Sequence, residues 1–227
     1  MFRRTFSLVA VFAMALATGY LLIKPESTQN TDNFELPFAA SAQSANTETA
    51  DTMPIEEMVI GDPNAPLTVI EYASFTCPHC ASFHENTYGD LKKNYIDTGK
   101  IKFVFREIYF DKYGIWASMI ARCVGPKKFF GLTDMLLSSQ RTWARAGDDL
   151  AIVNELSKIA RLAGMQEEQI QSCLRDGDKI KALVAWYKKN ATADGVRSTP
   201  SFMIDGQLYS NMDYDEFSKL LDEKLGS

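Results

Sequence analysis

Cys77 and Cys80 have the residue type and the spacing for redox chemistry, and Pro78 and His79 lie between them. Residues three apart on a helix share one face, so one thiolate could attack a substrate sulfur while the other thiol resolves the mixed disulfide. An apolar stretch at 69–75 comes directly before the pair, which predicts that a strand gives way to a helix at Cys77. The pattern therefore predicts thiol–disulfide exchange.

The predicted helix start gives the two thiols different roles. Backbone amides and the positive end of the helix dipole would stabilise a Cys77 thiolate, which makes Cys77 both the attacking sulfur and a good leaving group. A stabilised thiolate also favours the reduced form, so the disulfide form would be a strong oxidant. His79 could add a hydrogen bond or a positive charge beside that thiolate. Cys80, one turn deeper, is expected to be the buried resolving thiol.

Metal binding is the main alternative for the two cysteines. Zinc would need two further ligands, and His84, four residues after Cys80, could supply one on the same helical face. The chain has 2 histidines and 4 cysteines and no second pair with this spacing, so we expect no metal ion and no other cofactor. Covalent haem attachment is excluded because Ala81, and not histidine, follows Cys80. His84 is then expected to be an ordinary helix residue.

Glu71 is the only charged residue in the apolar stretch before the cysteines, six positions ahead of Cys77. If its side chain points inward, it lies beneath the thiols and could shuttle the proton of Cys80. At the edge of a strand it would instead reach solvent.

A strand–helix–strand unit must position these residues. Strands are expected at 58–60, 67–74 and 101–108, and a helix is expected from the cysteines to residue 97. A strand, a helix and a further strand in this order form a right-handed crossover, so the strands at 67–74 and 101–108 should be parallel.

An all-helical block is expected to interrupt this α/β pattern. Its apolar stripes predict helices at 116–123, 152–163 and 180–187. Strand character returns at 201–205, followed by a hairpin turn at Asp205-Gly206 and a closing helix at 213–225. Thr199-Pro200 comes just before this last strand, where a proline is allowed at a strand start or in a cis peptide bond.

Cys123 and Cys173 each lie in the apolar stripe of a predicted helix, Cys173 beside Ile170 and Leu174. Two buried free thiols or one structural disulfide would both satisfy this pattern. An oxidising compartment favours the disulfide.

Composition limits the class of protein. A chain of 227 residues with 46% apolar residues can bury a sizeable core. The formal net charge of -5 and the lack of a Lys/Arg cluster argue against nucleic acid as a partner. Residues 25–53 are polar and have no apolar period, so we expect a disordered linker or a discarded leader there.

The N-terminus predicts export. Arg3-Arg4 precedes an apolar run at 6–23, which is the layout of a signal peptide. Residues 1–24 are therefore expected to be a signal peptide or, if they are not cleaved, a membrane anchor. Ala40-Ser41-Ala42 is a candidate cleavage site, and the arginine pair also resembles the twin-arginine signal. The body of the protein is expected outside the cytoplasm, where disulfides persist.

Three motifs together resemble those of the DsbA-like thiol–disulfide oxidoreductases. They are Val69-Ile70-Glu71-Tyr72, Phe75-Thr76-Cys77-Pro78-His79-Cys80 and Val196-Arg197-Ser198-Thr199-Pro200-Ser201-Phe202. The resemblance covers 56–225. It implies an α/β, thioredoxin-like fold with an inserted all-helical domain. The domain boundaries expected from it are 54–110 and 191–227 for the thioredoxin-like domain and 111–190 for the insertion.

The resemblance also implies a function and roles for the site residues. It implies a periplasmic oxidase that donates disulfides to reduced or unfolded exported polypeptides and is reoxidised by a quinone-linked, DsbB-like membrane partner. Glu71 would carry the proton of Cys80. Pro200 would follow a cis bond that faces the cysteines, leaving the backbone before it free to pair with a substrate strand. Thr199 departs from the valine of the best-known oxidases and also occurs in isomerases, which leaves the direction of exchange open.

The sequence therefore leaves two alternative functions open. A disulfide isomerase or reductase usually carries a dimerisation domain, and residues 25–53 are too short and too polar to be one, so we expect a monomeric oxidase. The alternative from another class is a metal-binding or interaction module that uses the thioredoxin scaffold without turnover.

Overall fold

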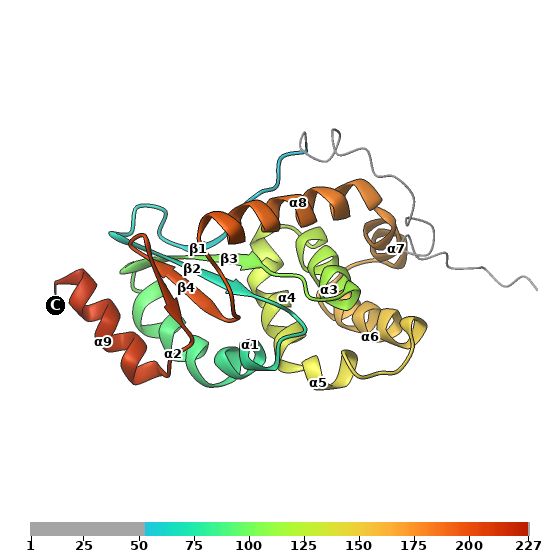
Figure 1. Cartoon of the computed structure of the whole chain (residues 1–227). Helices are drawn as coiled ribbons and strands as arrows, with labels where there is room; N and C mark the ends of the chain where they lie inside the picture. Colours follow the sequence, from blue (N-terminus) through green and yellow to red (C-terminus); the bar gives the residue numbers. More distant parts are fainter. Residues whose placement is uncertain (1–52, 227) are drawn as a thin grey trace, which may run out of the picture. The chain divides into compact units, whose positions relative to one another are not determined.

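The computed structural model describes residues 53–226 (Figure 1). The signal peptide or anchor expected at 1–24, the cleavage site at Ala40-Ser41-Ala42 and the linker expected at 25–53 lie outside this part of the chain, except for residue 53 itself. Within the described residues, no helix has both the length and the apolar character needed to cross a bilayer.

A five-stranded mixed sheet with the strand order β1-β3-β2-β4-β5 forms the centre of the fold. β2 and β3 are parallel, and the other neighbours pair antiparallel. The parallel pairing predicted from the strand–helix–strand order is thus confirmed. The strands are β1 (Met58–Gly61), β2 (Leu67–Ala73), β3 (Ile101–Glu107), β4 (Ser201–Ile204) and β5 (Gln207–Ser210).

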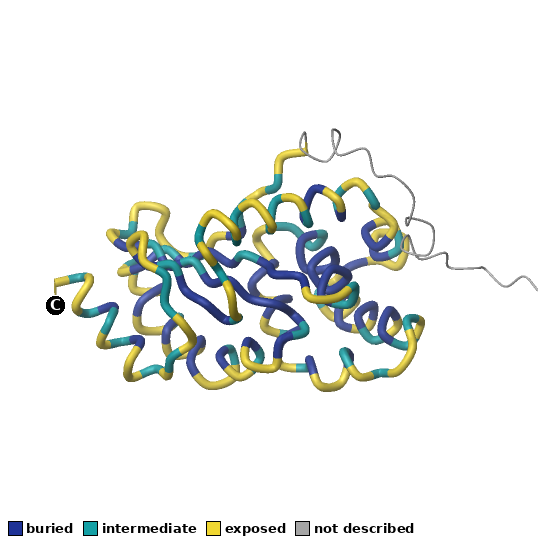
Figure 2. Tube along the Cα trace, viewed as in Figure 1, coloured by how far each residue is buried: buried dark blue, intermediate teal, exposed yellow. Residues whose placement is uncertain are grey.

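β2 and β3 occupy the middle of the sheet because their side chains are mostly apolar on both faces. Val69 on β2 and Phe103 on β3 are fully buried, and Figure 2 shows buried residues along both strands. Asp205 and Gly206, with φ angles of 50° and 73°, form the predicted hairpin turn between β4 and β5.

The helical stretch that follows β2 carries the two cysteines at its start. It ends within one residue of the predicted position 97 and consists of α1 (Pro78–Phe83), the π-helical η1 (His84–Tyr88), α2 (Gly89–Leu91) and the π-helical η2 (Lys92–Ile96). The Phe83 ring lies 4.8 Å from that of Phe202 on β4 and 6.1 Å from that of Phe217 on α9 (Tyr214–Leu225). These aromatic contacts hold α1 and α9 on the same face of the sheet.

The helices α3 to α8 separate β3 from β4 in the chain, as the helical periods predict. α3 packs against α4, α6 and α7, while α4 also contacts β1 and η1. Figure 1 shows α8 on the opposite face of the sheet from α1, α2 and α9. The bounds are α3 (Lys112–Cys123), α4 (Pro126–Ser138), α5 (Gln140–Trp143), α6 (Asp149–Leu162), α7 (Glu167–Arg175) and α8 (Gly177–Ala193).

Gly125-Pro126 does more than the sequence pattern indicates. The pair predicts the end of one helix, and α3 does end just before it. Gly125 has a φ of 88°, which reverses the chain, and Pro126 occupies the first position of α4. The same two residues therefore end α3 and begin α4.

The domain boundaries at 110 and 190 stay a prediction.

A buried ion pair joins α3 to the end of β3. Arg122 donates to both carboxylate oxygens of Glu107, from Nε and from Nη2, each at 2.6 Å. Ser118 Oγ donates to Glu107 at 3.0 Å, and Arg122 Nη1 donates to the carbonyl of Glu56 at 2.8 Å. The side chains of the pair are only 2% and 0% exposed, so each charge depends on the other for compensation.

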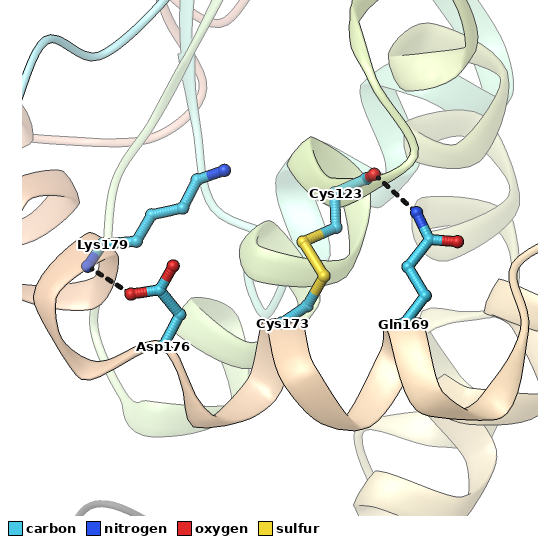
Figure 3. The surroundings of a disulfide bond; sticks show 5 residues. All are labelled: Cys123, Gln169, Cys173, Asp176 and Lys179. Carbon is cyan, nitrogen blue, oxygen red and sulfur yellow. Dashed lines mark hydrogen bonds between the residues drawn. A yellow bond between two sulfur atoms is a disulfide. The ribbon is translucent and has the colours of Figure 1, made fainter.

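A disulfide between Cys123, at the end of α3, and Cys173, on α7, links two helices of the block (Figure 3). The two Cα atoms lie 6.3 Å apart, and the bond closes a separation of 50 residues. Gln169 Nε2 donates to the Cys123 carbonyl at 3.3 Å beside it. Of the two arrangements left open by the sequence, the structure has the disulfide.

Replacing Arg122 by methionine should destabilise the protein by about 3 to 5 kcal/mol, because it leaves the Glu107 carboxylate buried without a cation. Urea unfolding followed by circular dichroism measures this. The double variant Arg122→Met/Glu107→Leu should recover most of the loss, since it removes both charges. A double variant as unstable as the sum of the single changes would contradict this account.

Removing the disulfide should cost about 4 kcal/mol of stability on the chain-entropy estimate for a loop of this length. The measurement is urea unfolding of Cys123→Ala/Cys173→Ala in a Cys77→Ser/Cys80→Ser background, where no other thiol can respond to redox conditions. Adding a reductant to the parent with the disulfide should give the same loss. A parent that is insensitive to reduction would argue against this stabilisation.

Candidate active site

Cys77 caps the N-terminus of α1, as the sequence pattern predicts. Its backbone is extended, with φ of -83° and ψ of 118°, and Pro78 takes the first helical position. The Cys77 carbonyl accepts hydrogen bonds from the N–H groups of Cys80, at 3.1 Å, and Ala81, at 3.2 Å. The Cys77 sulfur therefore lies at the end of a helix where free backbone amides favour negative charge.

The surroundings of Cys77 stabilise its thiolate. A hydrogen bond from the Cys80 thiol is the largest cause, helped by the side chain of Thr199 and the backbone N–H groups of Cys80 and His79 and opposed by partial burial, and together they lower the pKa of Cys77 to about 5. The Cys77 sulfur lies 3.4 Å from the Thr199 carbonyl oxygen. At neutral pH Cys77 is thus a thiolate, which is the form that attacks disulfides.

Cys80 has the opposite environment. It is fully buried, whereas Cys77 is 7% exposed. Burial raises the pKa of Cys80 far above its ordinary value, and the neighbouring Cys77 and Glu71 raise it further. Ser74 N–H lies 3.5 Å from the Cys80 sulfur. Cys77 is therefore the more accessible of the two sulfurs and carries the thiolate, whereas Cys80 is a buried, protonated thiol.

Glu71 is a buried acid on β2, the strand that leads to the two cysteines. Its side chain is 0% exposed, so the alternative of a strand-edge glutamate reaching solvent is wrong. It comes from β2, where its register partners are Phe105 and Phe202. Its Oε2 lies 3.0 Å from His84 Nε2, and its Oε1 has no hydrogen-bond partner among the described residues.

His84 is not the ordinary helix residue that was expected, and that prediction is wrong. Its side chain is only 4% exposed and lies between two carboxylates, Glu71 and Asp134. The two carboxylates oppose the effect of burial and raise the pKa of His84 to about 9, so the ring is an imidazolium at neutral pH. Both ring nitrogens have carboxylate partners, so the ring faces Glu71 and Asp134. The spacing of four residues from Cys80 was the one signal for this residue in the sequence.

His79 is placed differently from its expected role. Its side chain is exposed, and its contribution to the thiolate comes from the backbone N–H. The side-chain role expected for His79 stays a prediction.

Thr199 and Pro200 lie beside the cysteines although they are more than a hundred positions away in the chain. The Thr199–Pro200 peptide bond is cis, and Pro200 is buried just before β4. The carbonyl of Thr199 is the neighbour of the Cys77 sulfur. The structure therefore brings the last of the three motifs next to the motif that contains the cysteines.

Gln140 is a site residue that the sequence analysis missed. Its buried side-chain amide donates to the carbonyls of Phe75, at 2.8 Å, and Cys77, at 2.9 Å. It comes from α5, so the helical block holds the loop that carries the nucleophile. A single glutamine in a short helix has no local pattern that could have revealed it. A cavity of about 260 Å³, lined in part by Thr76, Pro78 and Gln140, lies next to this loop.

A mixed sheet, a dithiol at a helix start and a cis-proline loop beside it define a thioredoxin-fold redox protein. A model of the thioredoxin family matches residues 54–223. The chain is 37% identical over 171 residues to a Rickettsia prowazekii protein assigned as a protein-disulfide oxidoreductase, covering 74% of this chain and 61% of that protein. It is 24% identical to disulfide bond formation protein D of Bacillus subtilis, covering 74% of this chain and 76% of that protein.

Among solved structures, alpha-DsbA1 of Wolbachia pipientis superposes with a TM-score of 0.68 and 28% identity, covering 78% of this chain and 96% of that one. The chain therefore belongs to the thioredoxin family, and the relatives and structures that it resembles include disulfide oxidoreductases and a DsbA protein. The resemblance and the fold class predicted from the sequence are confirmed. The match spans less than two thirds of the length of the Rickettsia relative.

The reactivity of Cys77 should follow a pKa of about 5. The measurement is the rate of iodoacetamide alkylation of the reduced protein between pH 3.5 and 9, with the thiolate absorbance at 240 nm. In Cys80→Ala the midpoint should move to higher pH because the main hydrogen-bond donor is lost, whereas Cys80→Ser keeps a donor and should remain closer to the wild type. Equal midpoints for Cys80→Ala and the wild type would contradict the assigned cause.

Proposed function

We propose that this protein is an exported oxidase that introduces disulfides into polypeptides outside the cytoplasm. The observation that carries the proposal is the contrast between the two thiols, a thiolate at Cys77 and a buried, protonated Cys80. A stabilised thiolate lowers the free energy of the reduced form, so the disulfide form takes electrons readily from a substrate. The expected export signal at 1–24 supports a location in the periplasm.

The reaction we propose begins with the Cys77–Cys80 disulfide. A substrate thiolate attacks the Cys77 sulfur, the bond between Cys77 and Cys80 breaks, and Cys80 leaves as a thiolate that takes up a proton. A second substrate thiolate then attacks the substrate sulfur of the mixed disulfide, and Cys77 leaves as a thiolate. The substrate has lost two electrons and the enzyme has gained them. Because a thiolate of low pKa is a good leaving group, the last step is favoured.

In the reoxidation step, the reduced enzyme passes the two electrons on to a second protein. We propose that this partner is a quinone-linked, DsbB-like membrane protein, since the reduced enzyme needs an acceptor outside the cytoplasm. The Cys77 thiolate attacks the disulfide of the partner, and Cys80, once deprotonated, resolves the mixed disulfide. Glu71 is the buried base beneath Cys80 that we propose for this deprotonation. No metal ion, cofactor or nucleic acid enters the scheme, and the enzyme acts as a monomer.

Substrate recognition is proposed at the Thr199–Pro200 loop. The backbone next to the cis bond lies against the Cys77 sulfur, where an extended substrate segment could pair with it. An unfolded polypeptide fits such a site because backbone pairing does not depend on sequence. The threonine before the cis-proline keeps isomerase or reductase activity as the second candidate.

The oxidase should convert a reduced two-cysteine peptide to its disulfide with glutathione disulfide as the electron acceptor. Cys77→Ser should lose this activity, and equal activity of the variant and the wild type would exclude the proposal. The reduction potential measured against glutathione then determines the direction of electron transfer between the enzyme and its substrates. An oxidase should have a value above about -180 mV, whereas a value near -270 mV would identify a reductase. Efficient refolding of scrambled ribonuclease would identify an isomerase instead.

A further inference from the structure

Three charged side chains form a row that leads from beneath the thiols to the surface. Glu71 comes from β2, His84 from η1 and Asp134 from α4, and the ring of His84 lies between the two carboxylates. Its Nε2 is 3.0 Å from Glu71 Oε2, and its Nδ1 is 3.3 Å from Asp134 Oδ1. The side chains are 0%, 4% and 49% exposed in that order, so the row joins the interior to solvent.

The inner end of the row faces the resolving cysteine. Cys80 is fully buried and precedes His84 by four residues, one turn of the same helical stretch. Residues at this spacing share a face, so the thiol lies on the side of the helix where His84 contacts Glu71, and the Glu71 charge helps to raise the pKa of Cys80. Glu71 uses one carboxylate oxygen for His84, and its other oxygen, Oε1, has no hydrogen-bond partner in the described part of the chain. An unpartnered buried oxygen calls for an explanation, and a proton received from Cys80 would give Oε1 a role.

Aromatic rings enclose the middle of the row. The ring of Tyr88 stacks on His84 at a centroid distance of 4.5 Å, and those of Phe83 and Phe105 lie 5.6 Å and 6.0 Å away. Burial and nearby carboxylates raise the pKa of Tyr88 well above its usual range, so this phenol stays neutral. The two carboxylates are therefore the charged groups in contact with the ring, one from β2 and one from α4.

The outer end of the row opens into a surface cavity of about 430 Å³, lined by His84, Tyr88 and Asp134 together with Glu85 and Lys92. Glu85 and Lys92, on the same helical stretch as His84, are the remaining charged residues of this lining. Water in such a cavity can exchange protons with Asp134.

We propose that His84 and Asp134 are the outer half of a proton path that connects the Cys80 thiol, through Glu71, with solvent. The inference rests on the proposed redox function of the two cysteines and adds two positioning residues to it. Neither residue touches a substrate sulfur, because both act through Glu71.

The path carries away the proton that Cys80 releases in the resolving step. When the Cys77 sulfur forms a mixed disulfide with an electron acceptor, Cys80 gives its proton to Glu71 and its thiolate attacks the Cys77 sulfur, releasing the acceptor as a thiolate. The His84 imidazolium gives its Nδ1 proton to Asp134, from which it passes to water. The remaining ring proton then moves from Nε2 to Nδ1 by way of water in the cavity that His84 lines, which leaves Nε2 free. Nε2 accepts the proton of Glu71, and the imidazolium is restored. One proton has moved from Cys80 to solvent, and the reverse sequence supplies Cys80 during substrate oxidation.

The test measures the resolving step alone, using the full-length reduced protein and glutathione disulfide. Single-turnover reactions are quenched in acid at intervals, and the mixed disulfide and the final disulfide are counted by mass spectrometry between pH 5.5 and 9. His84→Gln keeps a polar side chain without the charge. We expect the rate at which the mixed disulfide is resolved to fall at least tenfold at pH 6 to 7. The difference from wild type should become smaller toward pH 9, because hydroxide can then remove the Cys80 proton without the path. Alkylation of Cys77 should stay within twofold of wild type.

Asp134→Asn tests the outer end of the proton path with little risk to folding, because Asp134 is half exposed. We expect a slowing of resolution of about threefold or more at pH 6 to 7 with no change in Cys77 alkylation. The matched control is Asp90→Asn, which removes an exposed carboxylate from the neighbouring α2 and should leave both rates unchanged.

Wild-type resolution rates and pH profiles in both His84→Gln and Asp134→Asn would overturn the proposal. An equal loss of resolution and Cys77 alkylation in both variants would also overturn it, because that result indicates a general disturbance of the site. Resolution by glutathione occurs in an oxidase, an isomerase or a reductase. A failure of the path is therefore distinguishable from a wrong direction of exchange, and a failure of the redox function would instead abolish the reaction in the wild type.

Discussion

The chemistry depends on one constraint, the single helical turn that separates an accessible sulfur from a buried one. Cys77 ends an extended segment and caps α1, where backbone N–H groups and the Cys80 thiol point at its sulfur. Cys80 lies one turn further, inside the core, where a charge has no water to stabilise it. The same short segment therefore produces a stable thiolate and a stable thiol.

The buried thiol is accompanied by buried charged side chains, and the helical block supplies polar and charged partners for the site. Glu71, the base that we propose for Cys80, is buried and is compensated by His84, whose second carboxylate partner comes from α4. Gln140 of α5 fixes the carbonyls of the nucleophile loop. The block is thus part of the site, and its own position on the sheet is held by the buried Arg122–Glu107 pair and by the packing of α4 on β1.

Local patterns predicted much of the fold and the centre of the site. The apolar stretch, the thiol spacing and the turn at Asp205-Gly206 are encoded within a few residues, so β2, the start of α1 and the β4–β5 hairpin were predictable. α4 was hidden because Gly125-Pro126 is a stop signal for one helix and a start signal for the next. His84 was expected to be an ordinary helix residue because one of its carboxylate partners, Asp134 of α4, is 50 positions away in the chain.

The sequence by itself determined the nucleophile and its place at a helix start, since each follows from residues close together in the chain. It also determined the family, because short motifs can be recognised without knowing how they pack. Only the tertiary structure decided what surrounds them. His84 and Asp134 are 50 positions apart, Gln140 and Phe75 are 65 apart, and Cys77 and Thr199 are 122 apart. Contacts at such separations depend on how helices pack on the sheet, and packing is a property of the whole core that no local pattern contains.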